Sequence, residues 1–134
     1  MDSPCEIEIV ELHQFFEDWF NGRLPDSEDA FERMDAVMAS CFEIVMPEGK
    51  RVPRDPLFSL LKNAHGKRTG IRIWIENVRE ILHEGGVVMA EYEEWQEEGG
   101  ETTSRVSTVV FREAAGTPNG LSWTRVHETW FENS

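Results

Sequence analysis

The order of the predicted elements is the feature that most constrains how this chain folds. Helical periodicity fills its first half, and strand-like alternation fills its second. Helices are predicted at residues 7–22, from Asp26 or Ser27 onward, and at 55–66. Four long strands are predicted at residues 71–82, 87–96, 102–112 and 121–131. Glycine-containing turns separate these strands, so the natural pairing is an antiparallel meander.

Helices that precede a meander predict an α+β fold in which the helices cover one face of an antiparallel sheet. A sheet of four long strands twists and curls. We therefore expect a cone-shaped single domain, residues 1–134, with a curved sheet, three N-terminal helices on its concave face and a pocket between them. A short strand over residues 41–46 is predicted between the second and third helices. Asp55 is predicted to cap the third helix, with Pro56 at its first position.

The net charge of the chain argues against some classes of binding partner. The chain has 26 acidic and 13 basic residues and a net charge of -13. Such a surface argues against nucleic acid, because phosphate recognition needs a basic patch, and it disfavours anionic membranes. No apolar run approaches the roughly 18 residues of a membrane span, and no signal peptide is recognised. We expect a cytoplasmic protein whose ligand is neutral or cationic.

Neither a metal nor a cofactor is predicted. Cys5 and Cys41 lack the paired spacing of a metal or disulfide motif, so both are expected to be free, with Cys41 buried. His13 and Glu17 lie one helical turn apart, but two residues are too few to hold a metal, and both are expected in solvent. The sequence contains no phosphate loop and no nucleophile elbow.

The element order resembles the nuclear transport factor 2-like superfamily, a cone-shaped, cystatin-like α+β fold. That superfamily includes polyketide-cyclase-like proteins, ketosteroid isomerases, dehydratases and many bacterial proteins. The resemblance covers residues 6–131. It is carried by the aromatic first helix that ends at Asn21-Gly22, the strand and turn of residues 42–49, and the closing strand with Trp123 and His127.

The ketosteroid isomerase constellation does not carry over to this chain. The resemblance places the isomerase tyrosine at Phe15, the aspartate base at Met46 and the second oxyanion donor near Ser107 or Thr108. A phenyl ring cannot donate a hydrogen bond to an oxyanion, and a thioether cannot accept a proton at neutral pH. Steroid-type isomerisation by those three positions is therefore not expected.

The predicted strand over residues 87–96 carries the main acid/base candidates. Glu91, Glu93 and Trp95 share one of its faces. If that face lines the cavity, two carboxylates about 6–7 Å apart beside an indole would raise one pKa and form an acid/base pair. If it faces solvent or a partner, the glutamates pair with Arg79 or Arg105 across the sheet. A shift of one residue in register would exchange the two outcomes.

The last two predicted strands supply the other candidates. His127 is either a general base or a hydrogen-bonded residue on the convex face. Glu128 has the opposite parity, so only one of the two can face the pocket. Arg105 either clamps a carboxylate or pairs with strand glutamates. The candidate catalytic residues are Glu91, Glu93 and His127. The candidate ligand-binding residues are Phe15, Trp19, Trp95, Arg105, Ser107, Glu128 and Trp130.

Two functions remain open from the sequence. The favoured one is a pocket for a small apolar or neutral organic molecule, with acid/base chemistry that needs neither metal nor cofactor, as in cyclase-like and dehydratase-like relatives. The rival is a non-catalytic association module. The strands carry apolar residues on both faces and helices can cover only one, so a sheet-to-sheet homodimer is predicted in either case.

Overall fold

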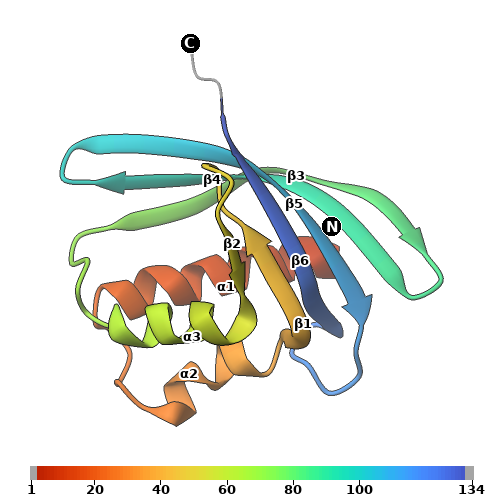
Figure 1. Ribbon diagram of the computed structural model, residues 1–134, viewed down its shortest axis with the longest axis horizontal. Coiled ribbons are helices and arrows are strands. Elements are labelled where there is room, and N and C mark those ends of the chain that lie inside the picture. The colour runs from red at the N-terminus through yellow and green to blue at the C-terminus, as the bar shows by residue number, and fades with distance from the viewer. Residues whose placement is uncertain (1–2, 132–134) are drawn as a thin grey trace.

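The computed structural model describes residues 3–131, which form three helices and six strands. The helices are α1 (Pro4–Phe20), α2 (Glu28–Asp35) and α3 (Arg54–Asn63). The strands are β1 (Met38–Val45), β2 (Arg51–Pro53), β3 (Arg72–Glu84), β4 (Val87–Glu98), β5 (Glu101–Glu113) and β6 (Leu121–Trp130). The helices lie under a curved sheet (Figure 1), which confirms the predicted α+β architecture. Within residues 3–131, no helix is long and apolar enough to cross a bilayer.

The sheet has the strand order β2-β1-β6-β5-β4-β3. Its β3–β6 part is the predicted antiparallel meander. The short strand β1 is longer than predicted and pairs in parallel with β6, with Ile44 opposite Val126. Strand β2 was not predicted, because three residues are too few to show alternation. It pairs with β1 across a tight turn in which the Gly49 amide donates to the Met46 carbonyl at 2.8 Å.

A bulge in β3 adds to the curvature of the sheet. The register with β4 shifts between Glu76 and Arg79, and Asn77 between them has a φ of 54°. Asparagine is among the side chains that tolerate this left-handed region. Its amide donates across the sheet to Glu93 Oε2 at 3.0 Å. Bulges increase strand twist, and this one helps β3 to bend over α1.

The apolar stripe of α1 forms the centre of the core. Ile9, Leu12 and Trp19 are at most 1% exposed. The Trp19 ring lies 5.2 Å from the ring of Phe31 in α2, and its Nε1 donates to the Leu61 carbonyl of α3 at 2.7 Å. Trp19 therefore joins all three helices, as a buried indole with a satisfied N–H can.

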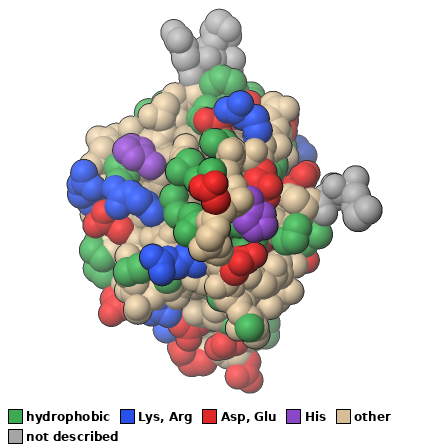
Figure 2. All heavy atoms as spheres, turned by 90° about the vertical axis from the view of Figure 1, so that its right-hand side faces the viewer, with side chains coloured by type: hydrophobic (Ala, Val, Ile, Leu, Met, Phe, Trp, Pro, Cys, Tyr) green, Lys and Arg blue, Asp and Glu red, His purple; other side chains and the backbone are tan. Residues whose placement is uncertain are grey.

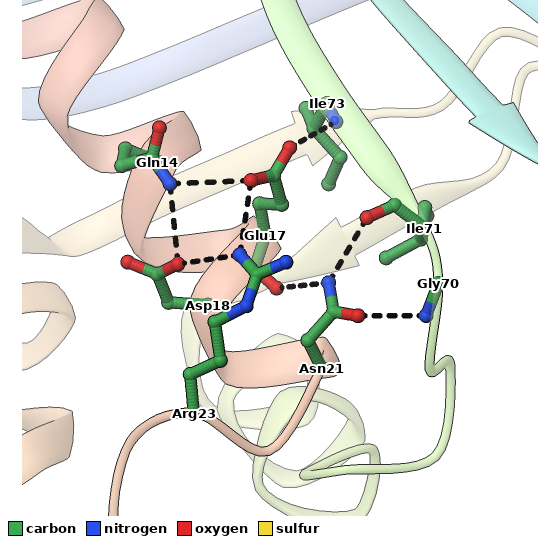
Figure 3. A network of polar contacts seen from close by, with 8 residues as sticks. All are labelled: Gln14, Glu17, Asp18, Asn21, Arg23, Gly70, Ile71 and Ile73. Carbon is green, nitrogen blue, oxygen red and sulfur yellow. Dashed lines mark hydrogen bonds and ion pairs between the residues drawn. The ribbon is translucent and has the colours of Figure 1, made fainter.

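Polar side chains at the end of α1 hold the start of β3 (Figure 3). Asn21 Nδ2 donates to the Ile71 carbonyl at 2.9 Å, and the Gly70 amide donates to Asn21 Oδ1 at 2.7 Å. The Ile73 amide donates to Glu17 Oε1 at 2.8 Å. The Glu17 side chain is only 17% exposed, so its prediction as a solvent residue was wrong. These bonds satisfy backbone groups of an edge strand that would otherwise be open.

The ends of α1 and α3 meet through two glycines. Gly22 has a φ of 74°, and a Cβ on it would lie 3.3 Å from the Gly66 Cα. The Gly66 amide donates to the Trp19 carbonyl at 3.0 Å, and the Arg68 amide donates to the Phe20 carbonyl at 3.1 Å. This close approach places the Arg68 side chain beside the aromatic end of α1.

Two local predictions are corrected. Helix α3 begins at Arg54 after Pro53, and the Asp55 side chain is 90% exposed and caps nothing. The helix starts earlier than predicted because it follows directly from β2, whose pairing with β1 already fixes the chain. Cys41 on β1 is exposed rather than buried, whereas Cys5 in α1 is buried. Ser27 does cap α2, as predicted.

Candidate functional site

The concave side of the sheet encloses a cavity of about 190 Å³ against the helices. This volume corresponds to about six water molecules at roughly 30 Å³ each, so it suits a small ligand. Apolar side chains make most of its wall, among them Phe16, Phe20, Met34, Met38, Leu57 and Ile73. Polar side chains converge on it from α1, three strands and the connection between α3 and β3: His13, Tyr92, Glu94, Gln96, Arg105, Glu128 and Arg68.

His13 and Glu94 form a buried ion pair in this cavity. The imidazole Nε2 lies 3.2 Å from Glu94 Oε1, and its Nδ1 lies 2.8 Å from the Ile9 carbonyl oxygen. Both partners are acceptors, so both ring nitrogens must carry protons. Burial favours the neutral ring, yet the Glu94 carboxylate and these hydrogen bonds outweigh it and raise the pKa of His13.

Glu94 is held in its ionised form. Burial opposes the charge, but His13, Arg105 and a hydrogen bond from Gln96 together bring the pKa of Glu94 well below its ordinary value. The Gln96 amide donates to Glu94 Oε2 at 2.7 Å, so both carboxylate oxygens have a partner. Glu94 is thus a fixed negative charge at the cavity wall.

Glu128 behaves in the opposite way. It accepts from Arg105 Nη1 at 3.2 Å and from the Ser107 hydroxyl at 3.5 Å, and it is 4% exposed. Burial and the nearby Glu94 charge exceed the help from Arg105 and raise the pKa of Glu128 to about 7. Two carboxyl groups whose environments push their pKa values apart are the usual basis for separate acid and base roles.

Arg105 and Tyr92 provide hydrogen-bond donors beside these carboxyls. Arg105 Nε is the one buried side-chain polar atom within residues 3–131 that lacks a hydrogen-bond partner, so it is available to an acceptor on a ligand. Burial and the charges of Glu94 and Glu128 raise the pKa of Tyr92 well above its ordinary value, which keeps the phenol protonated as a donor.

The structure turns Glu91, Glu93 and Trp95 to the convex face, away from this cavity. Arg79 Nη2 donates to Glu91 at 3.1 Å, which is the cross-strand ion pair that the sequence offered as the alternative. Glu93 accepts from the Trp95 indole at 3.1 Å. The register of β4 places Val88, Ala90, Tyr92 and Glu94 inside instead, so the proposed acid/base pair does not form at Glu91 and Glu93.

Strand β6 resolves the choice between His127 and Glu128. His127 is exposed on the convex face, whereas Glu128 and Val126 line the cavity. Trp123 also lines it, although strict alternation would turn it outward with His127. A register shift between Val110 and Phe111 of β5 accounts for this, because it changes the parity of β6.

The other predicted site residues lie in three different parts of the structure. Arg105 lines the cavity and also pairs with the strand residue Glu128, and Ser107 supports Glu128 from behind it. Phe15 and Trp19 are core residues, and the aromatic wall comes from Phe16 and Phe20 instead. Trp130 lies at the entrance, half-exposed, with the Arg105 guanidinium 4.9 Å from its ring centre.

Sequence reasoning missed His13 and Glu94. His13 was expected in solvent but is 4% exposed. Its position in the helix indicates burial, because Ile9 and Phe16 lie four residues before it and three after it on the apolar face of α1. The sequence also gave a sign that Glu94 is buried, because it shares one face of β4 with the apolar residues Val88 and Ala90. Within residues 3–131, no three His, Cys, Asp or Glu side chains are placed to hold a metal ion together.

Comparison with known proteins places the chain in a family. The family described as "Sucrose-6-phosphate phosphohydrolase C-terminal" matches residues 5–132. The chain belongs to this family. Sucrose-phosphatase 2 from Nicotiana tabacum, a relative, is 27% identical over 130 residues, which are 95% of this chain and 31% of that protein. The chain therefore spans under a third of the length of this relative.

Solved structures of related shape agree with the nuclear transport factor 2-like resemblance. An NTF-2 like protein of unknown function, PA1314 from Pseudomonas aeruginosa, has a TM-score of 0.85 and 26% identity, covering 96% of this chain and 98% of its own. The association domain of C. elegans CaMKII has a TM-score of 0.62 and 13% identity, covering 92% and 94%, and shares the fold alone. The family is thus of the nuclear transport factor 2-like fold.

Proposed function

We propose that the cavity binds a small neutral molecule with an apolar body and one carbonyl-like polar end, and exchanges a proton with it through Glu128. The observation that carries this proposal is the meeting of Glu94, His13, Arg105 and Glu128 in a cavity whose wall is mostly apolar. Pockets with apolar walls and a few convergent polar groups are the usual form of small-molecule sites.

Each polar residue has a distinct part in this chemistry. Tyr92 and the unpaired Arg105 Nε donate hydrogen bonds to the ligand oxygen. Glu128 removes or returns a proton at the adjacent carbon, since a carboxyl with a pKa of about 7 exists in both forms at neutral pH. Burial and the Glu94 carboxylate, which His13 keeps ionised, hold the pKa of Glu128 raised.

Ligand binding is tested first, with neutral fragments observed by NMR. Leu61 in α3 lines the cavity, whereas its neighbour Leu60 is 55% exposed and does not. We expect fragments that bind the wild type to bind Leu60→Trp equally and to lose binding to Leu61→Trp, because the added indole fills the cavity. Fragments that bind Leu61→Trp as well as they bind the wild type would show that the cavity is not the site.

Proton exchange is then measured on ketone fragments in D₂O. We expect deuterium to enter at the carbon next to the carbonyl, and Glu128→Gln to slow this by about 10²-fold or more, the range of general acid–base catalysis. Exchange should quicken as the pH rises through about 7, where Glu128 ionises. Binding without any enhanced exchange would show that the cavity binds the ligand but does not catalyse proton exchange.

A second function is favoured by the convex face. Trp74 and Trp95 stack there at 6.2 Å, and Phe131 meets Trp95 at 6.1 Å. Val106 and Val110 of β5 are also partly exposed on that face. The same fold serves as an association domain in the C. elegans protein, and in the tobacco relative it occupies only part of a longer chain. We propose that this face forms a sheet-to-sheet homodimer alongside the ligand site.

The homodimer is tested by light scattering. We expect the wild type to have twice the mass of the chain at micromolar concentration and Val106→Glu to have the mass of one chain. Glu93 lies opposite Val106 and offers a new carboxylate no partner, and a buried unpaired charge opposes an apolar interface. Leu60→Glu on α3, far from the convex face, should leave the mass unchanged. A wild type that scatters as one chain would rule out the dimer.

A further inference from the structure

A second hollow of about 280 Å³ adjoins the cavity at its entrance. It lies between the connection from α3 to β3 and the β4–β5 hairpin, at the left of Figure 1. Arg68, Gln96 and Arg105 line both spaces. We call this hollow the outer groove. The end of the molecule seen in Figure 2 lies on the other side, where charged side chains of both signs are mixed with small apolar areas.

Trp130 gives the outer groove a flat apolar surface. It is 50% exposed, which for a tryptophan leaves much of the indole open to a ligand. The Arg105 guanidinium, 4.9 Å from its ring centre, helps to fix its orientation. An exposed indole beside planar polar side chains fits a sugar ring, whose C–H face packs on an aromatic surface while its hydroxyls bond to the polar groups around it.

The charges in the outer groove are already paired. Arg68 binds Glu98 at 2.8 Å, and Arg105 binds Glu128 at 3.2 Å. Glu101 adds a further negative charge to the lining, and the whole chain carries -13. The lining therefore has no surplus positive charge with which to bind a phosphate. Bidentate side chains such as those of Arg68, Glu98 and Gln96 suit the paired hydroxyls of a neutral sugar instead.

We propose that the outer groove is a binding site for a neutral sugar ring, stacked on Trp130 and hydrogen-bonded by Arg68, Gln96 and Glu98. The site discriminates against phosphorylated sugars. It shares Arg68 and Gln96 with the cavity, but Trp130 and Glu98 line the outer groove alone, so the stacking surface is separate from the proton-exchange site.

The test follows the indole N–H signals of the protein by NMR while sucrose, methyl α-glucopyranoside or sucrose 6-phosphate is added. We expect the two neutral sugars to shift the Trp130 signal with saturable binding in the millimolar range, and sucrose 6-phosphate to bind several-fold more weakly. Trp130→Ala and Trp130→Leu should both weaken sugar binding about tenfold or more, since each removes the flat ring. The matched control, Trp74→Ala on the convex face, should bind like the wild type.

Leu61→Trp separates this site from the cavity. It should lose cavity fragments and keep the sugars, so failure of one proposal does not imply failure of the other. Three results would overturn the sugar site: no saturable shift with either neutral sugar, tighter binding of sucrose 6-phosphate than of sucrose, or unchanged sugar binding by the folded Trp130 variants.

Discussion

Replacing His13 with alanine should lower the free energy of unfolding by about 3–5 kcal/mol at pH 6, as expected when one partner of a buried ion pair is removed. The His13 and Glu94 side chains are only 5% and 8% exposed. Without the imidazolium, the Glu94 carboxylate stays buried without its principal cation. Edge-on packing of the imidazole against Phe16 and Tyr92, at 5.3 and 5.4 Å, is lost as well.

The matched control is His83→Ala. His83 also pairs with a glutamate, Glu113, at 3.3 Å, but these side chains are 51% and 57% exposed. An exposed pair contributes about 0–1 kcal/mol. Urea unfolding curves of both variants give the comparison. The penalty for His13→Ala should shrink toward acidic pH, where Glu94 can take up a proton. Equal midpoints for the two variants would mean that the buried pair contributes no more than a surface pair.

Glu128→Gln should remove a pH dependence from stability and leave the variant about 3 kcal/mol more stable than the wild type above neutral pH. The folded pKa of Glu128 is about 7, against an ordinary value of 4.5 in the unfolded chain. A group whose pKa is raised by folding contributes stability that is complete below its unfolded pKa and lost as the pH rises through its folded pKa. Glutamine resembles the protonated carboxyl at every pH.

The window for this measurement is pH 4.5 to 8. The two proteins should have similar stability near pH 4.5 and should diverge through pH 7. Glu94 has a lowered pKa in the folded protein, so its own slope lies near and below pH 4.5 and is present in both proteins, where it cancels in their difference. Thermal or urea unfolding at several pH values measures the difference. Parallel curves for wild type and variant would place the pKa of Glu128 at its ordinary value and remove the basis for its acid/base role.

Most of the fold could be predicted from the sequence, because local patterns of residues indicate its helices and strands. Glycine turns and alternation in the second half marked every strand of the meander to within a few residues. The parallel pairing of β1 with β6 was not accessible. It joins Ile44 to Val126, and no local pattern reports a partner so distant in the chain. The start of α3 was missed for a related reason, since its beginning depends on how β2 pairs.

The sequence predicted the kind of site, a buried carboxyl with a raised pKa, but not the residue that carries it. A buried glutamate with a raised pKa was anticipated, on Glu91 or Glu93, yet the structure has it on Glu128. The facing of a strand depends on its register, and a shift of one residue exchanges its inner and outer sets. Bulges near Asn77 and Thr124 alter parity in ways that side-chain alternation does not reveal. Arg105 and Glu128 were nevertheless among the named ligand residues.

The position of β6 in the sheet has a consequence for how the chain folds. This last strand lies between β1 and β5, so the N-terminal strand pair cannot join the meander until β6 is in place. The Trp123 indole reaches Glu8 across 115 residues of sequence. Folding that depends on such distant contacts is slow, because a long loop must close before the contacts form. We therefore expect the cavity to assemble late and all at once, after the helices and the β3–β5 hairpins already exist.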